Sequence, residues 1–174
     1  MRPSPPARGS RAVPAFVLLL AAACGPSGQG AVRPMTRTYY VAAEEVEWDF
    51  TPSGRNLISN ADWDEVQRPF VTAGDMHVGH LARKAIYREY TDSTFTTLKP
   101  RPAEWEHLGI MGPLLRGVVG DTIRVVFLNR ASFPASMHPH GVFYLKDSEG
   151  APYADGTDAA AKLDDGVTPG TQHT

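Results

Sequence analysis

Alternating apolar and polar residues predict β-strands in the first half of the chain. Residues 38–50 begin with β-forming side chains and continue with Val46, Trp48 and Phe50 separated by acidic residues. Such alternation places one face of a strand on a core and the other face in water. Residues 84–90 alternate less regularly, and we expect another strand there.

The strongest strand signal follows a turn at Gly120 and Asp121. Within residues 122–129, Ile123, Val125 and Phe127 occupy every second position, so they share one face of the strand. The pattern is typical of a strand in a β-sandwich.

Turn-forming residues separate these strands. Residues 51–82 contain scattered prolines and glycines and are expected to form a long loop or meander, whereas residues 137–144 predict a further strand. Residues 164–174 resemble a turn that feeds a last strand, which we expect to be cut off at Thr174. Short strands between turns favour an antiparallel β-sandwich over residues 37–174, incomplete at its C-terminus.

A positively charged and then apolar beginning predicts a signal peptide in residues 1–24. Arginines precede the apolar run of residues 15–23. Nine residues at ~1.5 Å each cannot cross a bilayer core of ~30 Å, so this run is not a transmembrane helix. We therefore expect export to a bacterial cell envelope or to the extracellular space.

Residues 20–24 (LAAAC) resemble the lipobox of bacterial lipoproteins, although Ala21 stands where the usual pattern has leucine. Lipidation of Cys24 would give the protein a membrane anchor, and no other membrane contact is expected. The alternative is simple cleavage after residues 21–23, which would release a soluble protein. Residues 25–36 are rich in glycine and proline and are expected to form a flexible tether.

Composition excludes several classes of function. The formal net charge is −2, and no lysine or arginine cluster marks the body, so we expect no nucleic-acid partner. Cys24 is the single cysteine of the sequence. The body therefore has no thiol for a disulfide, a cysteine-rich zinc site or a blue-copper site.

The motif with the clearest chemistry is His138-Pro139-His140-Gly141. On an extended segment, residues two apart project to the same side with Cα atoms ~6.5 Å apart. Two such imidazoles can reach two neighbouring metal ions without sharing one. Pro139 stiffens the pair. Neutral imidazole suits copper and zinc alike, and the alternative is a strand whose histidines only satisfy hydrogen bonds.

Residues 121–142, which include this motif, resemble the first cupredoxin domain of multicopper oxidases. Four other stretches narrow the resemblance to the ceruloplasmin and hephaestin branch, which coagulation factors V and VIII also join. They are residues 39–49 (YYVAAEEVEWD), 87–95 (YREYTDSTF), 108–113 (LGIMGP) and 149–153 (EGAPY). The resemblance covers residues 37–174 and implies an all-β, cupredoxin-like Greek-key β-sandwich.

The resemblance also implies copper ligands. In that family the first histidine of the motif binds the type 2 copper and the second binds a type 3 copper of a trinuclear cluster, which assigns these roles to His138 and His140. The cluster receives electrons from a remote type 1 copper and reduces dioxygen to water, and family enzymes oxidise ferrous iron or other small reductants. Since the other cluster motifs are not in this sequence, we expect a catalytically incomplete piece whose partners are the remaining cupredoxin domains.

A weaker implication concerns calcium. The family's first domain has an acidic loop, and Asp155, Asp164 and Asp165 lie at similar places here. Carboxylate oxygens suit Ca²⁺, but an acidic loop exposed to solvent is an equal alternative.

Two functions from different classes remain open. The first is the copper-binding N-terminal domain of an exported, ferroxidase-like multicopper oxidase. The alternative is a stand-alone copper-binding or scaffolding lipoprotein without oxidase activity. Outside the motif, we interpret His77 and His80 as surface histidines because glycines flank them in a loop, and we do not expect His173 to be a metal ligand.

Overall fold

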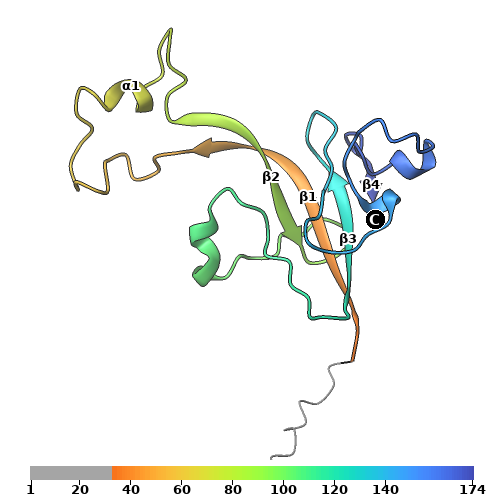
Figure 1. Ribbon diagram of the computed structural model, residues 1–174. Helices are drawn as coiled ribbons and strands as arrows, with labels where there is room; N and C mark the ends of the chain where they lie inside the picture. The colour runs from red at the N-terminus through yellow and green to blue at the C-terminus, as the bar shows by residue number, and fades with distance from the viewer. Residues whose placement is uncertain (1–32) are drawn as a thin grey trace, which may run out of the picture. The chain divides into compact units, whose positions relative to one another are not determined.

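The computed structural model describes residues 33–174 (Figure 1). The predicted signal peptide of residues 1–24, the candidate lipidation site Cys24 and most of the predicted tether lie outside the described residues. Within residues 33–174, no helix has the length and apolar character needed to cross a membrane.

Within the described residues, four strands form one open, mixed sheet in the order β2-β1-β3-β4 (Figure 1). Their bounds are β1 (Thr36–Asp49), β2 (Leu81–Tyr90), β3 (Thr122–Asn129) and β4 (Gln172–His173). β1 pairs antiparallel with β2, and β3 pairs antiparallel with β4. β1 and β3 are parallel neighbours, so the expectation of an entirely antiparallel arrangement was wrong for this pair. A parallel pair needs a long connection, and the chain between β1 and β3 runs over residues 50–121 and includes β2.

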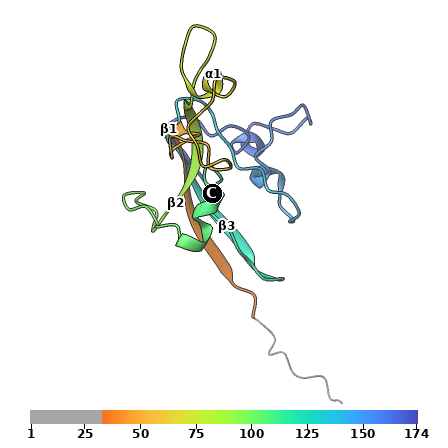
Figure 2. The same ribbon diagram turned by 90° about the vertical axis from the view of Figure 1, so that its left-hand side faces the viewer.

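The connections between strands carry short helices. They are the α-helix α1 (Arg68–Val71) and the 3₁₀-helices η1 (Ala103–Leu108), η2 (Lys146–Ser148) and η3 (Ala160–Lys162). The predicted loop of residues 51–82 is confirmed except for the short helix α1 and its last two residues, which begin β2. In Figure 2 the blue chain that follows β3 lies to one side of the sheet, and the green connection with η1 lies to the other.

The strand predicted at residues 137–144 is not formed. Pro139 has no N–H to offer a strand partner, and Gly141 takes a φ of 73°, which ends an extended conformation. The nearest sheet-like contact is a single bridge, in which Ala135 and Val167 exchange backbone hydrogen bonds of 3.2 and 3.0 Å. The two histidines therefore lie on an irregular segment.

Both faces of the sheet are covered. Successive residues at the centre of β1 point to opposite faces, and because they are apolar, each face buries part of a core. One core cluster contains Val41, Ala43, Phe127 and Val167, and the other contains Ala42, Tyr90, Phe95 and Leu128. The predicted strands over residues 38–50, 84–90 and 122–129 are thus confirmed. The described part of the chain is mostly strand and loop, consistent with a cupredoxin-like β-sandwich.

Asn129, at the end of β3, attaches the irregular chain to this sheet. Its side chain is fully buried, and its Nδ2 donates to the carbonyls of Phe133 at 2.8 Å and Val167 at 2.7 Å. Its Oδ1 accepts the N–H of Ala131 at 2.8 Å. One amide side chain thereby holds both the entry to the histidine segment and the later segment that pairs with it.

Replacing Asn129 with alanine should lower the free energy of unfolding by about 2–4 kcal/mol, because three hydrogen bonds are lost at roughly 1 kcal/mol each and their buried partners are left unpaired. Urea unfolding, extrapolated to water, measures this loss. The matched control is Arg124→Ala at an exposed position of the same strand, which should change stability by less than about 0.5 kcal/mol. Equal losses in the two variants would show that Asn129 has no special role.

Candidate metal centre

The structure brings the two motif imidazoles together. The rings of His138 and His140 have centroids 4.7 Å apart and planes inclined at 84°. Both residues are exposed, and the ring of Tyr144 lies 6.2 Å from that of His138. The two histidines thus project to a common side, as the sequence predicted, although no regular strand holds them.

The hydrogen bond made by His138 determines which of its nitrogens is free. Its Nδ1 lies 2.6 Å from the backbone carbonyl oxygen of Glu149. A carbonyl can only accept, so in the neutral ring Nδ1 carries the hydrogen and Nε2 keeps its lone pair. Histidines that bind metals characteristically donate their other ring nitrogen to such an oxygen. His138 therefore leaves Nε2 as the ring nitrogen with a free lone pair.

The segment that leads into the motif is tied to the sheet. The hydroxyl of Tyr87, from β2, donates to the carbonyl of Ser136. Tyr87 packs against Phe127 with ring centroids 5.7 Å apart, and burial raises the pKa of its hydroxyl. A neutral, donating phenol thus connects the core directly to the histidine segment.

Two imidazoles are what the described chain offers to a metal. Among residues 33–174, no group of three or more histidine, cysteine, aspartate or glutamate side chains is placed to hold an ion. Two exposed imidazoles fit copper, with the remaining coordination positions left to other donors. The donor set fits zinc equally well, so the geometry alone does not select the metal.

Comparison with known proteins shows to which protein family the chain belongs. Ferroxidase HEPHL1 of Homo sapiens is 43% identical over 166 residues, which are 94% of this chain and 14% of that protein. Hephaestin of Rattus norvegicus is 41% identical over 90% of this chain and 13% of its own length. Ceruloplasmin of Homo sapiens is 42% identical over 68% of this chain and 11% of its own length.

The chain belongs to the ceruloplasmin and hephaestin group of multicopper oxidases. No family model matches it. The matched region spans between 11% and 14% of the relatives' length, so the chain corresponds to one portion of much longer proteins.

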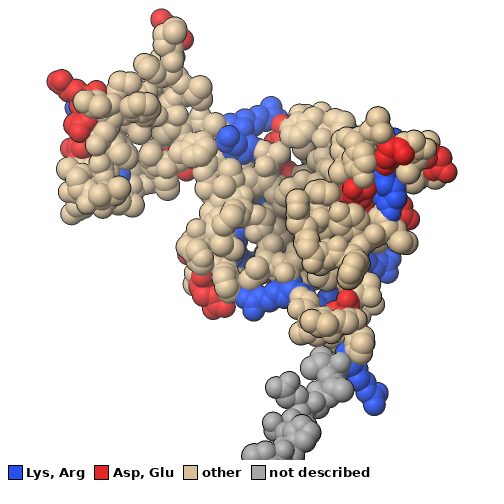
Figure 3. Space-filling model, in the orientation of Figure 1, with Lys and Arg blue, Asp and Glu red and all other residues tan. Residues whose placement is uncertain are grey.

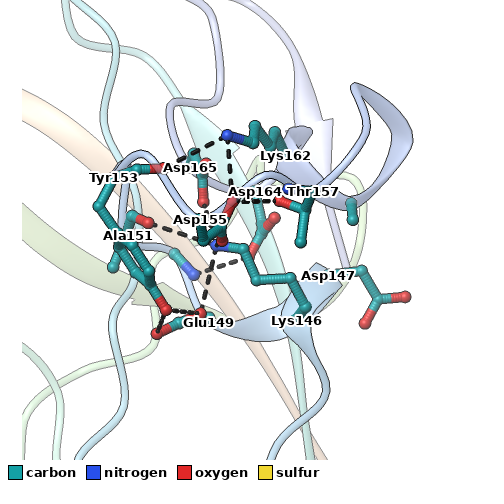
Figure 4. A network of polar contacts seen from close by, with 12 residues as sticks. Lys146, Asp147, Glu149, Ala151, Tyr153, Asp155, Thr157, Lys162, Asp164 and Asp165 are labelled. Carbon is teal, nitrogen blue, oxygen red and sulfur yellow. Dashed lines mark hydrogen bonds and ion pairs between the residues drawn. The ribbon is translucent and has the colours of Figure 1, made fainter.

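The acidic loop of this multicopper oxidase domain is organised around a lysine (Figure 4). The Nζ atom of Lys146 lies 3.2 Å from Glu149, 3.2 Å from Asp155 and 3.3 Å from Asp165. We call these four residues the Lys146 cluster. Figure 3 shows the same loop as interleaved acidic and basic side chains on the surface.

The geometry does not support the calcium site implied by the resemblance. Asp155 and Asp165 direct oxygens to the Lys146 ammonium, and Asp155 also contacts Lys162 at 3.3 Å. In the part of the chain that the structure describes, Asp164 forms no ion pair with either lysine, and its Oδ2 accepts the backbone N–H of Gly150. The three aspartates therefore do not converge on one cation position, and the present arrangement does not fit Ca²⁺.

Three members of the Lys146 cluster, Lys146, Asp155 and Glu149, remain charged over a wide pH range. Burial alone would lower the pKa of Lys146, but hydrogen bonds to its three carboxylate partners raise it above its ordinary value. Hydrogen bonds from Thr157 and from the two lysines hold the pKa of Asp155 well below its usual range. The pKa of Glu149 is lowered by Tyr153 and Lys146.

Two of the histidines outside the motif, His80 and His173, make polar contacts with the rest of the fold. The Nδ1 of His80 lies 2.8 Å from Asp49, and this contact is the main cause that lowers the pKa of Asp49. His77 is exposed, and the Nε2 of His173 lies 2.9 Å from the carbonyl of Asp147. None of the three lies in a group of three or more metal-binding side chains within the described residues.

Sequence reasoning did not find the role of Lys146 or of the Glu149 carbonyl. The one available signal for Lys146 was its position among acidic residues. No sequence signal identifies a backbone carbonyl as a partner, since every residue has one.

Lys146→Met should destabilise the domain at neutral pH, and the effect should shrink in acid. Because the pKa values of Asp155 and Glu149 are lowered by folding, their stabilising effect is complete above their unfolded values of about 4 and is lost as the pH falls below them. The raised pKa of Lys146 keeps the ammonium charged throughout this range. The melting temperature of both proteins between pH 3 and about pH 7 measures the difference.

Lys84→Met is the control, since Lys84 lies over the Phe50 ring at 5.5 Å, away from the Lys146 cluster. Its effect should not depend on pH in this range. A Lys146→Met deficit that stays constant from neutral pH to pH 3 would contradict the charge pairing.

Proposed function

We propose that residues 37–174 are the N-terminal cupredoxin domain of an exported multicopper oxidase, and that His138 and His140 supply one ligand each to its type 2 and type 3 coppers. The observation that carries the proposal is the pair of rings 4.7 Å apart, one of which has its Nδ1 engaged by a carbonyl. That arrangement leaves the Nε2 lone pair of His138 for a metal. Because both histidines are exposed, a metal bound there could take further ligands from outside the chain.

When bound, a copper cluster of this kind takes electrons from a reductant and reduces dioxygen to water. The contribution of this chain is to hold two imidazoles at one place, on exposed residues. One matched relative carries the name ferroxidase, so ferrous iron is the reductant we propose. The missing ligands and the type 1 copper belong to further cupredoxin domains, because Cys24 is the single cysteine of this sequence.

The proposed setting is outside the cytoplasm. Residues 1–24 have the layout of a signal peptide, and Cys24 is the proposed site of a lipid anchor. The alternative of a stand-alone copper-binding or scaffolding lipoprotein is not favoured, because the long relatives that match most of this chain include a protein named as a ferroxidase.

The double variant His138→Ala/His140→Ala should lose site-specific Cu²⁺ binding. The expected loss of affinity exceeds the ~10–100-fold that removal of a ligand's hydrogen-bond partner costs, because both donor atoms are gone. Calorimetric titration of the chain with Cu²⁺ measures the change. The control is His77→Ala/His107→Ala, which removes two exposed histidines outside the motif and should leave binding unchanged.

Oxygen consumption with ferrous iron tests the oxidase part of the proposal. In an oxidase that contains this domain with its other cupredoxin domains, the double variant of the motif should abolish consumption. Unchanged consumption, or equal copper affinity for the motif and control variants, would refute the assignment of ligands.

A further inference from the structure

Residues Glu149 and Gly150 form a short strap that lies against the backbone of the histidine segment. Gly150 is buried and has a φ of 65°, a conformation that favours glycine. A Cβ atom at this position would lie 2.2 Å from the carbonyl oxygen and 2.7 Å from the carbonyl carbon of Met137. The strap can approach His138 this closely only because residue 150 has no side chain.

Two side chains hold Gly150 from opposite sides. Its N–H donates to Oδ2 of Asp164 at 2.6 Å, and its carbonyl accepts the hydroxyl of Ser136 at 2.7 Å. Asp164 is only 4% exposed, and its Oδ1 has no hydrogen-bond partner among the described residues. Burying a carboxylate with one unpaired oxygen costs free energy. The hydrogen bond from Gly150 to the other oxygen offsets part of that cost.

The side chain of Glu149 is fixed as well. Its carboxylate accepts the hydroxyl of Tyr153 at 2.7 and 2.9 Å and lies 3.2 Å from Nζ of Lys146. The residue whose carbonyl meets His138 is therefore restrained both through its own side chain and through its neighbour Gly150.

We propose that Asp164 and Gly150 are positioning residues for the copper ligand His138. They place the Glu149 carbonyl against Nδ1, which keeps the hydrogen on Nδ1 and the lone pair on Nε2. The inference rests on the proposed function for the identity of the metal. The position of the hydrogen on the His138 ring, however, can be measured in the metal-free chain. Asp164 thus acts on the copper ligand through the backbone.

The chemical consequence follows from imidazole tautomerism. A neutral ring without a fixed partner can carry its hydrogen on either nitrogen, and a ring protonated on Nε2 offers no lone pair there. Loss of the hydrogen-bond partner of a ligating histidine typically costs ~10–100-fold in metal affinity. We expect a loss of this size when the strap is released.

Long-range ¹H–¹⁵N correlation spectra of the metal-free chain at about pH 8, where imidazoles are neutral, test the proposal directly. In the wild type, His138 should show the Nδ1–H form. In Asp164→Ala the Nε2–H form should become populated, whereas Asp164→Asn, which keeps an acceptor oxygen, should retain the wild-type signal. General loosening of the fold would not explain a change of tautomer in Asp164→Ala together with a wild-type tautomer in Asp164→Asn.

The matched control is Asp158→Ala. Asp158 belongs to the same loop, but its side chain accepts the N–H of Ala161 rather than that of the strap. The His80 signal, which reports the distant contact with Asp49, shows whether each variant is folded. If Asp164→Ala does not fold, Ser136→Ala removes the other support of Gly150 and should shift His138 in the same direction by a smaller amount.

Copper titration of the same variants separates the two proposals. If wild-type His138 is Nδ1-protonated and Asp164→Ala shifts it, but the wild type binds no Cu²⁺, the positioning role stands and the copper function fails. If copper binds through the motif but folded Asp164→Ala keeps both the Nδ1–H form and wild-type affinity, the positioning role is wrong. The combined expectation is a tautomer shift together with a ~10–100-fold weaker complex.

Discussion

The histidine segment depends on hydrogen bonds from side chains to backbone, because no sheet ladder holds it. After Asn129 the chain leaves β3 and makes a single bridge at Ala135 before it reaches the motif. The buried amide of Asn129 and the hydroxyl of Tyr87 supply the attachments that a strand partner would otherwise provide. The position of the candidate ligands is therefore set by a few individual contacts rather than by regular secondary structure.

This dependence explains what could be predicted from the sequence. The strand patterns of residues 38–50 and 122–129 reflect burial on the two faces of a sheet, so periodicity was sufficient to find them. Residues 137–144 have a similar composition, but Pro139 and the positive φ of Gly141 exclude a ladder there. Local propensity indicated extension and could not show that no partner strand was available.

The pairing of β1 with β3 and the Lys146 cluster were beyond sequence reasoning for a related reason. Whether two strands run parallel depends on the path of the connection between them, which no local pattern records. Asp155 and Asp165 could equally surround a metal ion or an ammonium group, and their spacing is the same in both cases. The side-chain direction of Lys146, which the structure supplies, distinguishes between them.

The two imidazoles of the motif are not equivalent in this structure. The ring of His138 is held by the Glu149 carbonyl, whereas the ring of His140 makes no hydrogen bond to any residue between 33 and 174. A fixed ring imposes its own direction on a metal, and a free ring can adjust to a metal that other groups have already placed. Under the proposed function, His138 is the ligand whose geometry this domain determines. His140, by contrast, takes its final orientation from the cluster that the other domains complete.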